Sequence, residues 1–378
     1  MTSAPKPVVI VVCGDPGGAS AMAPVLERLA EGRVRVRALA YKEARSIWGS
    51  RSLQFEELPE DFGEADAAQL LTESRAAALV VGTSGNSVDL EKRCTTAARR
   101  LGTPSLGLLD FWSNYRERFE DDNGVLAYVP DFIAVMDESA RDEMVALGFD
   151  AARLIVTGQP AFDDLPQIRA GFSSAQRERV RRALGAGSGA RLVAFASQPM
   201  AAIFGSSATN PGYMGYTEQE VLAALIRALH KVAQQGAPVV LAVLPHPRED
   251  PRSFHGLSSA QVEVVVSQDR SAHEVLMAAD LVVGMNSILL MEGCYLGCPT
   301  LSLQPGLRQA DTLPTNRLGI SRGVDDAAEI DSAVAELLLD QSSRRSLLQR
   351  LSGFRVDGGA AERVAGLIYS LTGAGGVR

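Results

Sequence analysis

The most constraining feature of this sequence is a regular alternation of short apolar runs with longer segments of helical period. Near-continuous apolar strands suit parallel sheets that helices cover on both faces. Eleven runs rich in Val, Ile, Leu and Ala are predicted as strands: Val8–Cys13, Val34–Tyr41, Ala78–Gly82, Ser105–Asp110, Phe132–Met136, Leu154–Thr157, Leu192–Ser197, Val239–Leu244, Val262–Val266, Leu281–Gly284 and Thr300–Leu303. The intervening segments repeat apolar residues three and four apart, as amphipathic helices do. The pattern predicts an α/β chain with doubly wound sheets.

The alternation is interrupted once, between residues 159 and 189. This stretch holds Pro160, Pro166, a charged helical segment and the glycine-rich run Gly185-Ala-Gly-Ser-Gly. The strand pattern then restarts at Leu192. We therefore predict two domains, residues 1–165 and 166–355. The final segment, residues 356–378, is predicted to form a helix that packs back on the first domain.

Charge and composition exclude several classes of protein. The formal net charge is −8, which argues against a protein that coats nucleic acid. No apolar run reaches the roughly 18 residues of a membrane span, and the start lacks a signal-peptide pattern. No His or Cys completes a zinc set around the cysteines. We therefore expect a cytoplasmic protein with reduced thiols, without a transmembrane segment, a metal site or a nucleic-acid partner.

Ligands of open α/β sheets bind beyond the carboxyl ends of strands, so the loops there hold the candidate site residues. After the first strand, Gly17 and Gly18 open a path to the backbone at a helix start. The loop lacks the G-x-G-x-x-G fingerprint of NAD or FAD sites, so no cofactor is expected. The alternative is a simple turn in which Asp15 caps the helix. After the third strand, Ser84 is a candidate contact, the alternative being that Ser87 merely caps the next helix.

The loop after the fourth strand combines aromatic, charged and amide side chains. Asp110, Trp112, Asn114 and Arg116 follow directly on the strand. Sugar rings stack on aromatic side chains, and their hydroxyls bond to carboxylates and amides. These residues are therefore candidates for binding an acceptor. The alternative is that Trp112 and its aromatic neighbours are core residues.

Three loops of the second half carry groups suited to an anion. Ser197 and Gln198 leave the first strand of this half, and His246 and Arg248 leave the second. A lone His is usually structural, but His246 stands between two prolines that fix its direction. Arg308 follows the last predicted strand and is available to a phosphate.

A further loop, after Gly284, begins a helix. Asn286 or Ser287 is predicted to cap it, so that its N–H groups face a diphosphate. Glu292 lies about one and a half turns further along, within reach of the two hydroxyls of a ribose. The alternatives are that Ser287 is only a cap and that Glu292 forms a structural salt bridge.

These residues resemble known sequence motifs. Ser287 followed by Glu292-Gly-Cys-Tyr-Leu-Gly-Cys-Pro299 resembles the nucleotide-binding segment of GT-B glycosyltransferases and of non-hydrolysing UDP-N-acetylglucosamine 2-epimerases. His246-Pro247 resembles the His-Pro motif of bacterial sialyltransferases, Kdo transferases and teichoic-acid glycerophosphotransferases. Val156–Asp163 looks like the segment that ends the first domain in such proteins. The Asp-(Asp/Glu)-Gly motif of the bacterial sialyltransferases is absent, and the epimerases' acidic and basic set is not fully matched.

The resemblance implies a GT-B enzyme with two Rossmann-like domains that face a cleft. The second domain would hold a nucleotide-activated sugar such as a UDP-sugar, with Glu292 on the ribose and Ser287 on the diphosphate. The first domain would bind the acceptor, which could be a small molecule, a saccharide or a lipid-linked group. GT-B transferases generally need no metal, and no D-x-D pair lies at a suitable strand end.

The chemistry predicted from these residues is glycosyl transfer. Inverting transfer needs a base for the acceptor proton. Asp110 is the first choice because its apolar neighbours would raise its pKa, and Asp15 is the second because a helix N-terminus would lower its pKa. The alternatives are a nucleotide-sugar 2-epimerase and a catalytically silent nucleotide-sugar-binding module. The donor nucleotide and the oligomeric state stay open.

Overall fold

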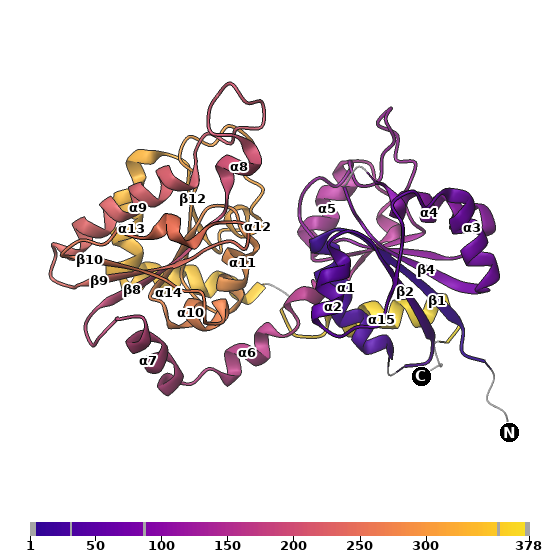
Figure 1. Cartoon of the computed structure of the whole chain (residues 1–378), viewed down its shortest axis with the longest axis horizontal. Coiled ribbons are helices and arrows are strands. Elements are labelled where there is room, and N and C mark those ends of the chain that lie inside the picture. Colours follow the sequence, from indigo (N-terminus) through magenta and orange to yellow (C-terminus); the bar gives the residue numbers. More distant parts are fainter. Residues whose placement is uncertain (1–4, 31, 86–87, 354–355, 375–378) are drawn as a thin grey trace. The chain divides into compact units, whose positions relative to one another are not determined.

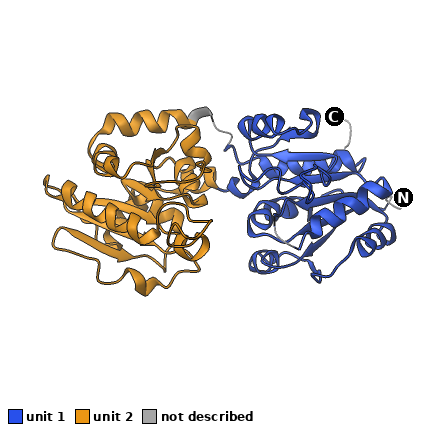
Figure 2. Cartoon of the chain, turned by 90° about the horizontal axis from the view of Figure 1, so that it is seen from above, with its two compact units in different colours: residues 1–164, 355–378 blue, residues 165–354 orange. Residues whose placement is uncertain are grey.

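The computed structural model describes residues 5–30, 32–85, 88–353 and 356–374. The chain forms two compact units, shown in two colours in Figure 2. Unit 1 comprises residues 1–164 and 355–378, and unit 2 comprises residues 165–354. Each unit is a parallel sheet with helices on both faces (Figure 1), so the predicted α/β class is confirmed.

Unit 1 is built on a seven-stranded parallel sheet. Its strands are β1 (Val8–Cys13), β2 (Arg35–Ala40), β3 (Glu56–Glu57), β4 (Ala76–Gly82), β5 (Ser105–Leu108), β6 (Phe132–Val135) and β7 (Leu154–Val156). Their order across the sheet is β3-β2-β1-β4-β5-β6-β7. The chain starts in the middle with β1, winds outward to β3, and crosses back to β4. The order therefore reverses between β1 and β4.

Helices bury both faces of this sheet. They are α1 (Pro16–Ala30), α2 (Ala44–Ser50), α3 (Glu64–Glu73), α4 (Leu90–Leu101), α5 (Glu138–Ala146) and α15 (Ala360–Leu371). On β1, Val9 and Val11 pack in one apolar cluster, and Ile10 and Val12 pack in another. Complete burial of each such side chain stabilises the fold by about 1.5–3 kcal/mol. This two-sided burial explains why the central strands lack polar residues.

The final helix belongs to unit 1. Helix α15 lies against α1, and its Val364 and Ile368 are fully buried in the same apolar cluster as Met22 and Leu29 of α1. The backbone N–H groups at its start, those of Ala360 and Ala361, donate to the carboxylate of Asp163 at 2.9 and 2.7 Å. The chain end therefore completes one face of the first sheet.

Unit 2 is built on a six-stranded parallel sheet. Its strands are β8 (Arg191–Ala196), β9 (Val239–Leu244), β10 (Val262–Val266), β11 (Leu281–Gly284), β12 (Thr300–Leu303) and β13 (Arg322–Val324). Their order is β10-β9-β8-β11-β12-β13, so the reversal falls between β8 and β11. The helices are α6 (Leu165–Gly171), α7 (Ser174–Ala183), α8 (Met200–Phe204), α9 (Glu218–Ala233), α10 (Ala272–Ala278), α11 (Ile288–Tyr295), α12 (Pro314–Arg317), α13 (Ile330–Leu339) and α14 (Gln341–Gln349).

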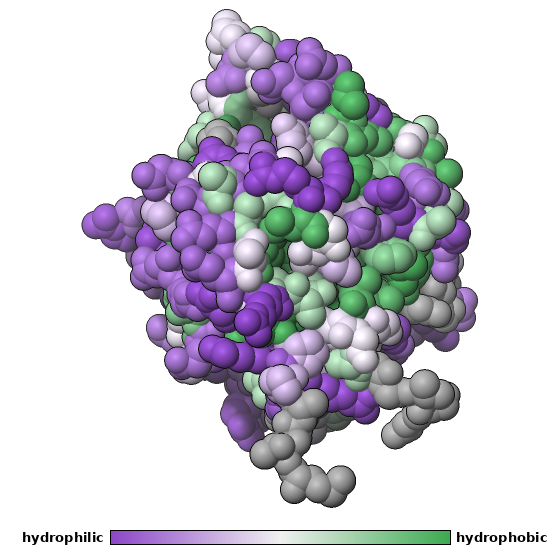
Figure 3. All heavy atoms as spheres, turned by 90° about the vertical axis from the view of Figure 1, so that its right-hand side faces the viewer, coloured by the Kyte–Doolittle hydropathy of each residue, from purple (hydrophilic) through white to green (hydrophobic). Residues whose placement is uncertain are grey.

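One face of the molecule is shown in Figure 3, where hydrophilic side chains and apolar patches lie side by side. Within the described part of unit 1 the exposed large apolar side chains are those of Leu101, Val125, Val145 and Leu147. No described helix has the length and apolar character needed to cross a membrane. The four cysteines are buried and unpaired as disulfides.

Candidate functional site

Each sheet offers one place where a ligand of an open α/β fold is expected. The strand order reverses between β1 and β4 in unit 1 and between β8 and β11 in unit 2. We call residues 14–18 and 83–85 the unit 1 switch point. We call residues 197–199 and 285–287 the unit 2 switch point. The predicted site residues are concentrated in and around these two regions.

Side-chain amides join the loops at the unit 2 switch point. The Gln198 carbonyl Oε1 accepts a hydrogen bond from the Asn286 backbone N–H at 2.9 Å. The Asn286 side-chain Nδ2 in turn donates to Thr312 Oγ1 at 2.9 Å. Loops that follow β8, β11 and β12 are thus held together by neutral groups. Sequence reasoning found Gln198 and Asn286 but missed Thr312, which lies 26 residues further along the chain.

The helix start at this switch point is open. Ser287 occupies the N-cap position of α11, but its side chain makes no capping hydrogen bond. Ser287 therefore stands at the predicted cap position, but without the side-chain hydrogen bond that usually makes a serine a cap. Ser287 Oγ is buried and has no hydrogen-bond partner among the described residues. The first turn of α11 contains no acidic residue. A buried unpartnered hydroxyl is costly, and a ligand oxygen would satisfy it.

Glu292 projects from the middle of α11 and is partly paired. Its Oε2 lies 3.0 Å from Nε2 of His273, and the two side chains are 19 % and 27 % exposed. No donor among the described residues reaches its other carboxylate oxygen, Oε1. The predicted alternative, a structural salt bridge, therefore describes the contact of Oε2 but gives no role to Oε1. His273 was not singled out from the sequence.

The loop after β9 fixes the tautomer of His246. The Arg248 backbone N–H donates to His246 Nδ1 at 3.1 Å, which leaves the ring proton on Nε2. Glu249 supports the loop by accepting from the His246 backbone N–H at 2.7 Å and from Ser197 Oγ at 2.8 Å. Burial lowers the pKa of His246, and Arg248 lowers it further against the opposing effect of Glu249. The ring is therefore a neutral Nε2–H donor at pH 7.

Two exposed arginines flank this region. Arg248 lies in the loop after β9, and Arg308 lies in the loop after β12. The Arg308 guanidinium lies over the ring of Tyr213, 5.4 Å from its centroid, and its backbone N–H donates to the Met214 carbonyl at 3.0 Å. The tyrosine ring limits the motion of the Arg308 guanidinium by contacting its flat face. The N–H groups at the edge of the guanidinium can still meet an anion.

The unit 1 switch point is occupied by a buried carboxylate of the chain itself. Glu91 in α4 is 4 % exposed. Its Oε1 accepts from Gly14 N–H at 3.0 Å and from Ser84 Oγ at 2.7 Å, and its Oε2 accepts from the Tyr41 hydroxyl. Burial raises the pKa of Glu91 to about 7, against the hydrogen bonds from Tyr41 and Ser84. A Cβ at Gly14 would overlap the Tyr41 ring, so this position requires glycine.

Two more carboxylates lie against the same loops. Asp15 Oδ2 accepts from Gly85 N–H at 3.3 Å and so links the loops after β1 and β4. Asp110 pairs with the guanidinium of Arg118. Its other oxygen lies where a Cβ on Gly17 would be, at the start of α1. The start of α1 thus faces a carboxylate of this chain. The expectation of purely apolar neighbours around Asp110 is wrong, because its carboxylate pairs with the charged Arg118.

The predicted aromatic platform after β5 is part of the core. Trp112 is 3 % exposed, its indole N–H donates to Asp137 Oδ2 at 2.7 Å, and its ring stacks on Phe162 with 6.4 Å between centroids. The expectation that it offers a free face to a sugar is therefore wrong, and the core alternative holds. Arg116 donates to the carbonyls of Leu147 and Gly124, which makes it a loop support.

The other residues predicted from the sequence, Asn114 and Gly18, lie in a turn and in the core. Asn114 is exposed with a φ of 54°, as suits a turn. Gly18 is buried, and a Cβ there would lie 3.1 Å from Cys13 Sγ. Ser87 lies outside the described residues. Within residues 5–30, 32–85, 88–353 and 356–374, no cluster of three or more His, Cys, Asp or Glu side chains is arranged to hold a metal ion.

Comparison with known proteins identifies the fold. No protein-family model matches the chain. No curated protein matches its sequence. A putative UDP-N-acetylglucosamine 2-epimerase from Listeria monocytogenes is 16 % identical, with 97 % of this chain and 96 % of that chain covered and a TM-score of 0.69. MnaA of S. aureus, solved with UDP, is 13 % identical, with 97 % of each chain covered and a TM-score of 0.67.

A third similar structure is a transferase by its description. The glycotransferase of kitacinnamycin is 19 % identical, with 97 % of this chain and 100 % of that chain covered and a TM-score of 0.60. Identities this low show a shared fold. The chain has the GT-B fold with two Rossmann-like units, as the sequence resemblance predicted.

Proposed function

We propose that the chain is a glycosyltransferase that takes its sugar from a UDP-sugar bound at the unit 2 switch point. The observation that carries the proposal is the open start of α11, where the buried Ser287 Oγ meets no partner in the described ranges, followed by Glu292, which is paired through one oxygen. Glu292 lies five positions after Ser287, a rise of about 7.5 Å along the helix axis. That spacing suits a diphosphate at the helix start and ribose hydroxyls at the free Oε1.

The surrounding donors suit a diphosphate that leaves with extra negative charge. His246 offers Nε2–H, and Arg248 and Arg308 offer guanidinium groups from neighbouring loops. Together with the N–H groups of α11 they would stabilise the leaving group without a metal ion. UDP is the first nucleotide to test, because the similar MnaA structure holds UDP.

In this proposal unit 1 binds the acceptor, and Asp110 takes the acceptor proton. The Asp110 carboxylate is held by Arg118 through one oxygen, and the other lies beside the Gly17 backbone. Such a group can accept a proton from a hydroxyl that reaches its second oxygen. Asp15, which lies in the same loop system, is the second choice for the base.

Calorimetry with UDP tests the donor site. Glu292→Ala should weaken binding by about 1.5–3 kcal/mol, the range for hydrogen bonds to a charged group. Ser287→Ala should weaken it by about 0.5–1.5 kcal/mol. Glu178→Ala, which changes an exposed carboxylate of α7 in the same unit, is the matched control and should bind like the parent. Unchanged UDP binding by folded Glu292→Ala would exclude this site.

The alternative reaction is epimerisation of the nucleotide sugar itself. The similarity to the Listeria epimerase over nearly the whole chain favours it as the second candidate. Incubation with UDP-N-acetylglucosamine alone separates the two. An epimerase converts it to the 2-epimer without any acceptor, whereas a transferase leaves the sugar configuration unchanged. A silent binding module binds UDP and turns over nothing, with or without acceptors.

A further inference from the structure

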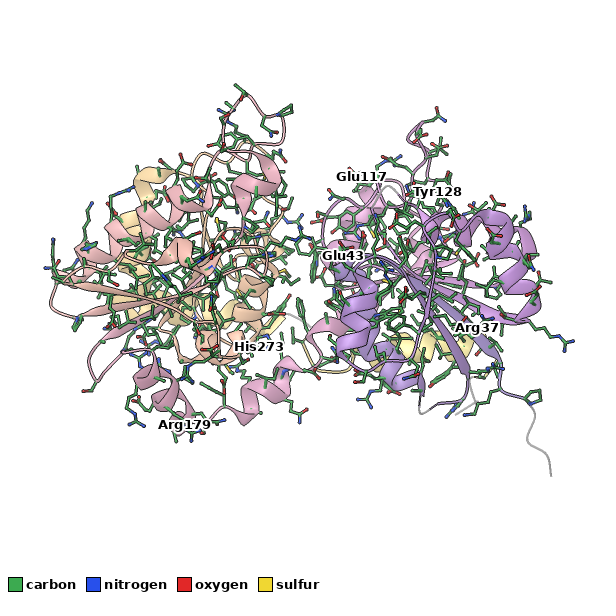
Figure 4. All side chains as sticks on the ribbon, viewed as in Figure 1. Arg37, Glu43, Glu117, Tyr128, Arg179 and His273 are labelled. Atoms are coloured by element: carbon green, nitrogen blue, oxygen red, sulfur yellow. The ribbon has the colours of Figure 1, made fainter. Side chains whose placement is uncertain are left out.

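The partner of Glu292 lies on a different helix and was not predicted. His273 is the second residue of α10, which follows β10, and Glu292 lies on α11, which follows β11. Helices that follow strands of a parallel sheet begin at the carboxyl edge of that sheet. His273, labelled in Figure 4, is therefore placed on the ligand-binding side of unit 2, where its Nε2 meets Glu292 Oε2 at 3.0 Å.

Glu292 needs a partner for a physical reason. It is the one charged side chain in the sequence of α11, Ile-Leu-Leu-Met-Glu-Gly-Cys-Tyr, and it is 19 % exposed. A carboxylate on an apolar, largely buried helix is costly unless it is hydrogen-bonded. His273 Nε2 faces a carboxylate oxygen that only accepts, so Nε2 carries the proton in either charge state of the ring.

The pair leaves the carboxylate in a defined orientation. A glutamate has three side-chain torsions, and an unheld carboxylate would have to be ordered when a ligand binds. The hydrogen bond from His273 to one oxygen restricts the rotation of the carboxylate and favours orientations in which Oε1 points away from the ring. Such preorganisation lowers the entropic cost of binding. The two ribose hydroxyls can then donate hydrogen bonds to a carboxylate that is already oriented.

We propose that His273 is a positioning residue that orients Glu292 and thereby sets the preference for ribonucleotides over 2′-deoxyribonucleotides. The proposal rests on the function proposed above, since it takes Glu292 as the ribose contact. A contact that only held α10 and α11 together would affect the binding of all nucleotides equally. A contact that orients Glu292 affects most strongly the binding of nucleotides with a 2′-hydroxyl.

The test compares UDP with 2′-deoxy-UDP by calorimetry, in the parent and in His273→Ala. The parent should prefer UDP. His273→Ala should weaken UDP binding by about three- to tenfold and 2′-deoxy-UDP binding by less than about twofold, because the Glu292 contact, worth more than tenfold, is loosened and not removed. His273→Gln places an amide N–H near the former Nε2 and should restore most of the preference. His230→Ala, which removes a histidine of α9 bonded to Ser259, is the matched control and should change neither affinity.

The outcomes separate this proposal from the one it rests on. If Glu292→Ala abolishes the preference but His273→Ala weakens both nucleotides equally or neither, the positioning role is wrong and the donor site stands. If folded Glu292→Ala binds UDP like the parent, both proposals fail. Should His273→Ala not fold, His273→Leu fills the space without offering a donor. The positioning role then predicts a smaller preference for UDP, and a preference equal to the parent's contradicts it.

Discussion

The two switch points have the same topology and opposite chemistry. In unit 1 the backbone groups that could meet an anion already face carboxylates of the chain: Gly14 N–H bonds to Glu91, and Asp110 lies beside the start of α1. In unit 2 the linking groups are neutral amides, and the Ser287 hydroxyl at the start of α11 has no partner among the described residues. A helix start after a central strand therefore marks an anion site only where the chain leaves it unoccupied.

The difference extends to the glutamates that follow the two central strands. Glu91, after β4, is buried and accepts three hydrogen bonds from within unit 1. Glu292, after β11, accepts one, and its other oxygen meets no donor from the described part of the chain. The first has the environment of a structural carboxylate that joins loops, and the second has that of a ligand contact. In the proposed function, unit 1 would accordingly meet hydroxyl groups and take the proton, and unit 2 would hold the nucleotide diphosphate.

The strongest effect is expected at Asp110, and it tests whether unit 1 supplies the general base. Asp110→Asn keeps the shape of the side chain but removes its ability to take a proton. We expect the rate of sugar transfer at saturating donor to fall by about 10²–10⁴-fold, the usual share of general base catalysis. UDP affinity should barely change, because the proposed donor contacts are in unit 2. A rate within about threefold of the parent would exclude Asp110 and favour Asp15.

The second prediction concerns the buried carboxylate of unit 1. The pKa of Glu91 is raised to about 7 in the folded chain, above its ordinary 4.5, so the folded state holds this proton more tightly than the unfolded state does. Stability from this group is complete below about pH 4.5 and is lost as pH rises through 7. Its total is on the order of 3 kcal/mol.

Glu91→Gln removes this titration and keeps one acceptor oxygen, with an amide NH₂ group in place of the other oxygen. The parent should lose about 2–3 kcal/mol more unfolding free energy than the variant between pH 5 and pH 8. Urea unfolding can be followed by tryptophan fluorescence, because both tryptophans, Trp48 and Trp112, lie in unit 1. Equal losses in the two proteins would show that Glu91 stays ionised at pH 5.

A weaker effect is expected for the neutral histidine of unit 2. His246→Asn should weaken UDP binding at pH 7 by about 0.5–1.5 kcal/mol, the value of one neutral hydrogen bond. Because the pKa of His246 lies below its ordinary 6.5, protonation should add affinity only below that pH. Calorimetry at steps from pH 7.5 down to the lowest pH at which the chain stays folded should therefore show a difference between parent and variant that widens in acid. A constant difference over a range in which a histidine pH titration shows the ring becoming charged would mean that it does not face the phosphates.

The strands could be predicted from the sequence because two-sided burial removes polar residues from them. Val239–Leu244 and Val262–Val266 have the predicted bounds. The missed strands, β3 and β13, are edge strands of two and three residues with almost no apolar signal. The C-terminal helix could be predicted because its apolar face needs a sheet or another helix to cover it.

The candidate site could be predicted only in part. The rule that ligands meet strand ends locates Gln198, Asn286 and Ser287, because each directly follows a strand. It cannot supply partners from distant segments: Glu91 meets Gly14 across 77 residues, and His273 meets Glu292 across 19. Residue order alone also cannot predict that the Trp112 side chain points into the core and not toward a ligand.

In the proposed function the nucleotide binds at the unit 2 switch point and leaves the unit 1 switch point untouched. Hydrogen exchange of the whole chain with and without saturating UDP is the direct test, because backbone N–H groups that bind a ligand exchange more slowly. We expect slower exchange in peptides that cover residues 197–200 and 285–292, with no change in residues 13–18 and 83–85. Slower exchange in the unit 1 peptides alone would contradict the proposed site.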